Sequence, residues 1–140
     1  MKSFAAFIAP FVVVFAAHAP TVPSDSSERQ CEAVAVHMEA RGESLRGQRA
    51  VLDIIRNRMW HRKLTACEVV KEPHQFSFYH PGFSLEASKE QLTRLKKLVT
   101  MQPVLGTAVT HFHAFYVKPG WAKKFKRVVV IGAHSFYVKE

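Results

Sequence analysis

The sequence predicts an α+β domain, with helices in the first two thirds of the chain and a small antiparallel sheet at the C-terminal end. Apolar residues recur at helical spacing in the segment that ends at Glu39 and in segments 44–59 and 84–101. From residue 107 the period changes, and 109–117 and 127–131 have the β-branched and aromatic content of strands. Helices followed by strands are typical of an α+β domain, and 140 residues are enough for one.

The first helix places a carboxyl group at the edge of an apolar face. Cys31, Val34, Ala35 and Met38 recur at i, i+3, i+4 and i+7, and Glu39 borders that face. Burial disfavours the charged form, so the pKa of Glu39 should rise, as a general acid working near neutral pH requires. The same spacing also fits an ordinary surface glutamate near a helix end.

The second helix, 44–59, has a broad apolar stripe and should be largely buried. Glu43 fits its start, where negative charge offsets the free N–H groups. Glu39 and Glu43 are four residues apart and would form a two-carboxylate pair on a continuous helix, but Gly42 between them disfavours continuity. We therefore assign Glu43 a structural role.

A loop over residues 74–81 interleaves aromatic and amide side chains, which suits a wall that binds sugars. Alternatively, Phe76 and Phe78 simply anchor this loop to the core. The helix 84–101 reads as scaffold. Pro119-Gly120 supplies a turn between the first two strands, and 133–138 makes a third strand.

The N-terminal residues 1–19 have the pattern of a signal peptide. Lys2 is followed by an apolar stretch and small residues, and cleavage after Ala16 is favoured because Pro20 directly follows the alternative site at Ala19. The stretch is short for a transmembrane helix, although an uncleaved leader acting as a weak anchor stays open. We expect a linker over 20–27, a domain over 28–140, and a secreted or periplasmic monomer in the cell envelope without a stable membrane span.

Cys31 and Cys67 are the only cysteines. An even pair in an exported protein favours one disulfide, which would join the first helix to the segment after the second. Two separately buried thiols are the alternative, since the geometry of the pair is not fixed by sequence.

The formal net charge of +9 indicates a polyanionic partner, either nucleic acid or an anionic envelope polymer or membrane surface. The sequence has no helix-turn-helix pattern, zinc-finger spacing or aromatic RNA-binding signature. We therefore expect no nucleic-acid partner.

An ordered set of short motifs connects these segments. They are Glu39-Ala40-Arg41-Gly42-Glu43, Gly47-Gln48 with Ala50-Val51, Asn57-Arg58, Cys67-Glu68-Val69-Val70, Gln75-Phe76-Ser77, His111-Phe112-His113, Pro119-Gly120-Trp121 and Ile131-Gly132-Ala133-His134-Ser135-Phe136-Tyr137. The set resembles the cell wall hydrolases of the spore cortex-lytic enzyme type over roughly residues 31–138. The resemblance implies a helix-rich, lysozyme-like core and a peptidoglycan-cleaving enzyme related to lytic transglycosylases.

By that resemblance, Glu39 is the catalytic acid. It would protonate the linkage between N-acetylmuramic acid and N-acetylglucosamine and then act as the base, with no cofactor and no second carboxylate. Gln75, Ser77, Tyr116 and Trp121 are the expected substrate-binding residues, although Tyr116 and Trp121 fit core or turn positions equally well. Hydrolysis is the second mechanism, and it requires a base or nucleophile across the cleft.

Two other classes of function remain open. His111 and His113 point to one face of a strand, and His134 or His37 could complete a zinc site of an envelope amidase or peptidase. The sequence has no His-Glu-x-x-His signature, so we assign no metal site. The second alternative is a non-catalytic basic module that binds peptidoglycan through residues such as Arg62, Lys123, Lys124 and Lys126.

Overall fold

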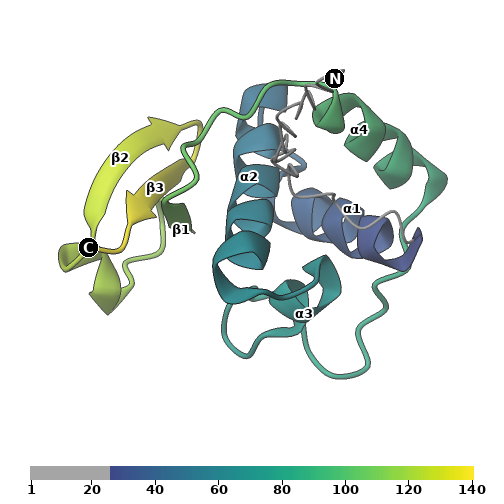
Figure 1. Ribbon diagram of the computed structural model, residues 1–140, viewed down its shortest axis with the longest axis horizontal. Helices are drawn as coiled ribbons and strands as arrows, with labels where there is room; N and C mark the ends of the chain where they lie inside the picture. Colours follow the sequence, from purple (N-terminus) through teal and green to yellow (C-terminus); the bar gives the residue numbers. More distant parts are fainter. Residues whose placement is uncertain (1–25) are drawn as a thin grey trace, which may run out of the picture.

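A computed structural model describes residues 26–140 (Figure 1), and the predicted signal peptide and most of the predicted linker lie outside that range. The elements are α1 (Ser26–Ala40), α2 (Leu45–Arg62), α3 (Ala66–Lys71), α4 (Lys89–Val99), β1 (Val109–Ala114), the short 3₁₀ helix η1 (Gly120–Lys123), β2 (Lys126–Ile131) and β3 (His134–Val138). Helices therefore precede a small sheet, and the predicted α+β class is confirmed.

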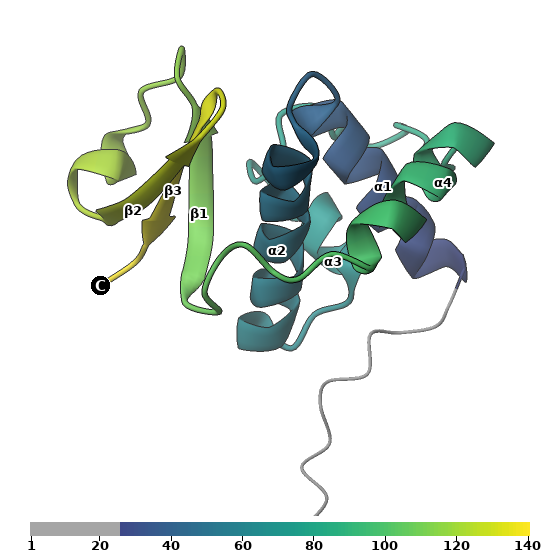
Figure 2. The same cartoon turned by 90° about the horizontal axis from the view of Figure 1, so that it is seen from above.

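The long helix α2 stands between two layers. Figures 1 and 2 show the sheet on one side of α2, with α1 and α4 on the other. Leu52 and Ile55 of α2 are fully buried among the helices, whereas Ala50 and Ile54 are fully buried against the sheet. Since α2 turns one apolar face to each layer, its stripe is broad, as the sequence predicted.

Side-chain caps fix where the helices begin. The Ser44 side chain accepts a hydrogen bond from the backbone N–H of Gly47 at the start of α2. Thr65 with Glu68 and Ser88 with Gln91 form complete capping boxes at α3 and α4. The Ser88 cap explains why α4 begins at residue 89, five residues later than the apolar pattern indicated.

The sheet has the strand order β1-β3-β2, and both pairings are antiparallel. Each outer strand carries an irregularity, one between Val109 and His111 and the other between Arg127 and Val129. Phe136 of the central strand is fully buried and stacks on Phe112 of β1, with ring centroids 5.9 Å apart. Phe112 packs against both cores and so joins the sheet to the helices.

A buried ion pair holds the segment that leads from α4 into the sheet. Arg49 Nε donates to Asp53 Oδ1 at 2.8 Å, and both side chains are almost fully buried. Asp53 Oδ2 accepts from the backbone N–H groups of Val104 and Leu105, while Arg49 Nη1 donates to the Leu98 carbonyl. No buried side-chain nitrogen or oxygen of the pair lacks a hydrogen-bond partner among residues 26–140, the condition under which a buried ion pair is tolerated.

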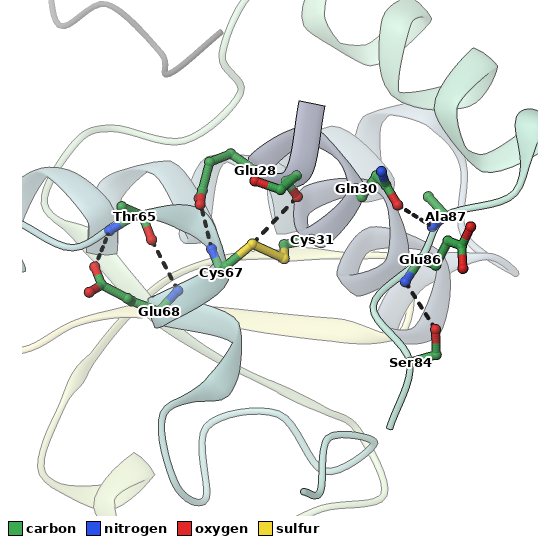
Figure 3. Close-up of a disulfide and its surroundings, with 10 residues drawn as sticks. Glu28, Gln30, Cys31, Thr65, Cys67, Glu68, Ser84, Glu86 and Ala87 are labelled. Atoms are coloured by element: carbon green, nitrogen blue, oxygen red, sulfur yellow. Dashed lines mark hydrogen bonds between the residues drawn. A yellow bond between two sulfur atoms is a disulfide. The ribbon is translucent and has the colours of Figure 1, made fainter. Parts of the chain in front are cut away.

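The disulfide predicted between Cys31 and Cys67 is present and joins α1 to α3 (Figure 3). Beside it, the Glu28 carboxylate accepts a hydrogen bond from the backbone N–H of Cys67 at 3.0 Å. Elsewhere on α1, Gln30 Oε1 accepts from the backbone N–H of Ala87. These contacts tie the loops that flank α3 and α4 to the first helix.

None of the helices in residues 26–140 is sufficiently long and apolar to cross a membrane.

Candidate active site

Glu39 lies in the last turn of α1, where the helix approaches the junction with α2. Its side chain is half-buried, and burial raises the pKa of its carboxyl group above 4.5. The positive charge of Arg58 partly opposes this rise in pKa. Within residues 26–140 no hydrogen bond holds the Glu39 carboxyl group, so its oxygens are free to meet a ligand.

Arg58 comes from the C-terminal half of α2 and is nearly fully buried. Its Nε donates to the carbonyl of Thr110 in β1 at 2.8 Å, and its guanidinium lies 5.4 Å from the centre of the Phe76 ring. Its Nη1 is buried without a hydrogen-bond partner among residues 26–140. Burial lowers the pKa of Arg58 to about 10, so the side chain stays cationic at neutral pH.

The loop that contains Gln75 and Ser77 reaches this position through the ring between them. Phe76 is buried and lies near Arg58 on one side and Phe112 on the other. Gln75 is half-buried and Ser77 is exposed. Phe76 thus anchors the loop, as one sequence interpretation held.

Glu43 connects the beginning of α2 to the turn between β2 and β3. Its Oε1 accepts a hydrogen bond from the backbone N–H of Ala133 at 3.1 Å, and the Nδ1 of buried His134 lies 3.6 Å away. Gly132, at φ 56°, leaves the space that the carboxylate occupies. We call the contact of Glu43 with Gly132, Ala133 and His134 the Glu43 latch; it agrees with the structural role expected for Glu43.

Tyr116 lies on an exposed turn after β1. The exposed fractions of Phe115 and Tyr116 are 73% and 75%, and their rings meet edge to face. The backbone N–H of Phe115 donates to the carbonyl of Ala133 at 2.8 Å. This aromatic tip, formed by Phe115 and Tyr116, therefore stands at the end of the sheet that the Glu43 latch holds.

Trp121 packs within a cluster of aromatic rings. It lies in η1 and contacts the rings of His111, His113, Phe125 and Tyr137, with centroid separations of 5.2–5.8 Å. Because successive side chains of a strand point to opposite faces, this cluster covers the face of β1 opposite Phe112. No hydrogen bond or ring contact joins Trp121 or Tyr116 to Glu39 within residues 26–140.

The histidines considered for zinc are engaged in this packing. His113 Nδ1 lies 2.8 Å from the carbonyl oxygen of Ala114, and its Nε2 lies 2.8 Å from the Tyr137 hydroxyl. His111 Nδ1 lies 2.9 Å from Thr110 Oγ1, and burial lowers the pKa of His111 to about 4. Among residues 26–140, no three His, Cys, Asp or Glu side chains come together as a metal site would require.

A groove of about 760 Å³ is lined by residues of α1 and α4 and by Arg56 of α2. Glu32 and Arg56 both line this groove and form an ion pair. Arg56 Nε donates to Glu32 Oε1 at 2.9 Å, and Arg56 Nη2 donates to Glu32 Oε2 at 3.2 Å. Neither Glu39 nor Arg58 lines this groove. The candidate chemistry therefore lies outside this groove.

Sequence reasoning missed the part that Arg58 takes in the site. Asn57-Arg58 was recognised in the sequence only as a motif, and in the structure Asn57 Nδ2 donates to the carbonyls of Gly106 and Val109. Arg58 makes such a bond as well, but it also acts on the charge of Glu39. The helical spacing carries no sign of this, because Arg58 is nineteen residues from Glu39 on another helix.

A family model described as Cell Wall Hydrolase matches residues 42–137 of the chain. The match includes Glu43, Arg58, Gln75 and Ser77, and it begins three residues after Glu39. No curated protein matches the chain.

Two solved structures are similar to the fold. The catalytic domain of the germination-specific lytic transglycosylase SleB of Bacillus anthracis has a TM-score of 0.69 and 24% identity, over 82% of this chain and 97% of that one. The catalytic domain of Bacillus cereus SleB has the same TM-score and identity, over 86% of this chain and 98% of that one. The similarity confirms the predicted helix-rich α+β fold with its small C-terminal sheet.

Proposed function

Because the chain belongs to the cell wall hydrolase family, we propose that it cleaves the glycan strand of peptidoglycan between N-acetylmuramic acid and N-acetylglucosamine, with Glu39 as the acid and base. The observation that best supports this proposal is the environment of Glu39. Its carboxyl group is half-buried, has a raised pKa and makes no hydrogen bond within residues 26–140. Such a group holds its proton to higher pH than an exposed glutamate does, which suits a general acid.

The favoured reaction is that of a lytic transglycosylase, the activity named for the similar B. anthracis domain. Protonated Glu39 donates its proton to the glycosidic oxygen as the bond from that oxygen to C1 of the muramic residue breaks. The Glu39 carboxylate then takes the proton of the C6 hydroxyl while that oxygen bonds to C1. Glu39 ends protonated again, and the product carries an anhydro-muramic end.

Arg58 fits a supporting role in this cycle. Its cationic charge lies close enough to favour the ionised form of Glu39, so it offsets the negative charge left after the first proton transfer. Its bond to Thr110 fixes the position of this charge. Gln75 and Ser77, which flank Phe76 beside Arg58, are proposed substrate contacts, as are Tyr116 and Trp121.

The test is digestion of purified peptidoglycan by wild-type protein and by Glu39→Gln, with products identified by mass spectrometry. Anhydro-muramic ends that are absent with Glu39→Gln are the expected result. Reducing ends would keep the glycosidase but replace the transglycosylase step by attack of water. Cleavage of stem peptides alone, or full activity of Glu39→Gln, would refute the assignment.

Glu43→Gln is the matched control, since it changes the same group four residues away. A glutamine keeps an oxygen that can accept from Ala133, so most of the activity should remain. If Glu43→Gln abolished activity and Glu39→Gln did not, the roles of the two carboxyl groups would be reversed.

The family acts on the cell wall, so the cell envelope is the place of action. Export as a secreted or periplasmic protein stays a prediction, because residues 1–19 lie outside the described range. The monomeric state is likewise a prediction.

A further inference from the structure

Positive charge is concentrated in the C-terminal part of the chain. Residues 109–140 contain six cationic side chains and one acidic side chain, a net charge of +5 in 32 residues. Residues 26–108 contain thirteen cationic and nine acidic side chains, a net charge of +4 in 83 residues. The sheet and its turns are therefore far more basic than the helices.

Most of this charge lies at one end of the sheet. We use the name outer basic end for five exposed side chains, namely Lys123, Lys124, Lys126, Arg127 and Lys139. Register places Lys126 opposite Val138, next to Lys139, and η1 directly precedes β2. Figures 1 and 2 both show η1 and the C-terminus on the side of the sheet away from the helices.

Structural needs do not account for this charge. The only acid nearby among residues 26–140 is Glu140, 4.0 Å from Lys126, and both side chains are about two-thirds exposed. Such a pair is weak in water. Lysine on an edge strand can prevent pairing with other sheets, but only Lys126 and Arg127 lie on the edge strand β2.

The aromatic residues argue against a bilayer as the partner. Insertion at a membrane interface places exposed aromatic side chains among the cations. Here the exposed aromatic tip stands at the Ala133 end of the sheet, whereas the cations gather at the Lys126–Val138 end. Trp121 and Phe125, which lie among the cations, pack on each other and on His111.

The geometry points to the outer basic end as a second contact site for the polymer substrate, one that binds the carboxylates of peptidoglycan stem peptides. This inference rests on the proposed function. A hydrated polyanion needs charge without insertion, and the peptide-bearing wall offers many carboxylates on neighbouring strands. Contacts at the outer basic end would keep the enzyme on the wall between cleavages, because a second binding event within one network raises the effective concentration.

The experiment measures binding of Glu39→Gln protein to insoluble peptidoglycan, so that the wall is not digested. Lys123→Glu with Lys124→Glu is the test variant. The matched control is Lys96→Glu with Lys97→Glu, two adjacent exposed lysines on α4 with the same change of charge. We expect the test variant to bind about tenfold more weakly at low salt, since each exposed ion pair contributes up to about fivefold, and the control to change little.

Binding to two other materials, amidated peptidoglycan and lipid vesicles, identifies the partner. Peptidoglycan whose stem-peptide carboxylates have been converted to amides should bind the test variant and the α4 control equally and weakly. Vesicles containing phosphatidylglycerol should bind the unsubstituted protein less well than peptidoglycan does. Unchanged binding to the amidated wall, an equal loss in the α4 control, or tighter and Lys123-dependent binding to vesicles would each overturn the inference.

Folding and function are checked separately. Lys126→Glu with Arg127→Glu is a second test variant, and a loss of binding counts only for variants whose thermal unfolding midpoint is unchanged. Cleavage of short, soluble glycan fragments by the Lys123→Glu, Lys124→Glu protein should match that of wild type. If wild type fails to cleave these fragments, the proposed function fails, whereas the binding comparison still decides the role of the outer basic end.

Discussion

The Glu43 latch makes the protein sensitive to substitution of Gly132. Its φ of 56° lies in the left-handed region, where a residue with a side chain costs about 1–2 kcal/mol. A Cβ atom at this position would lie 1.8 Å from Glu43 Oε2 and 2.8 Å from Glu43 Cδ. Gly132→Ala must therefore displace the carboxylate as well as strain the turn.

Displacement of Glu43 removes the hydrogen bond from Ala133, a further loss of about 1–3 kcal/mol for a bond to a charged group. We expect Gly132→Ala to lower the free energy of unfolding by about 2–5 kcal/mol in total. Urea unfolding of the oxidised protein measures this free energy. An unchanged slope of the free energy of unfolding against urea concentration would show that the unfolded state is not altered.

Gly82→Ala is the matched control. Gly82 also has a positive φ, 93°, but a Cβ atom there would meet nothing within 4 Å, so only the backbone strain applies. In a Glu43→Ala background, Gly132→Ala should likewise cost only the strain, because the collision is gone. An equal cost of Gly132→Ala and Gly82→Ala, or an equal cost in both backgrounds, would refute the latch.

Three further predictions concern titration and the disulfide. Glu39→Gln should stabilise the protein above pH 4.5. Because the pKa of Glu39 is raised in the folded state, the folded state binds more protons than the unfolded state above pH 4.5, and stability falls as pH rises through the folded pKa. Thermal unfolding against pH measures this change. The pKa of His111 is lowered from 6.5 to about 4, so the unfolded state binds more protons between these values and stability falls as pH falls through that window; His111→Phe should flatten the urea-unfolding profile there. Replacing Cys31 and Cys67 by serine should cost roughly 4 kcal/mol, the loop entropy for a separation of 36 residues, again measured by urea unfolding; a loss under about 1 kcal/mol would contradict this mechanism.

The parts of the fold that local patterns specify were predictable. The helical stripe of α2 contains Leu52 and Ile55, which are fully buried, and the disulfide was the favoured state of the two cysteines of an exported protein. The borders were less certain, because they depend on single caps. Ser88 begins α4 with a capping box, whereas the apolar pattern extends further toward the N-terminus.

The environment of Glu39 was predictable, but that of its neighbours was not. The apolar face of α1 correctly indicated a half-buried Glu39 with a raised pKa. The contact of Glu43 with Ala133 spans 90 residues, and no local period encodes such a distance. Both faces of β1 carry rings, so alternation alone does not show that Phe112 faces the helices while His111 packs with Trp121 on the other side.

The position of Arg58 links the docking of the sheet to the acidity of Glu39. The guanidinium is held by the Thr110 carbonyl of β1, although the residue itself belongs to α2. A change that shifts the sheet against the helices therefore moves the charge that opposes the raised pKa of Glu39. The Glu43 latch fixes the opposite corner of the same junction through Ala133. Loosening the latch should thus alter the pH dependence of cleavage without any change to Glu39, because the seam between sheet and helices sets the electrostatic field in which the acid works.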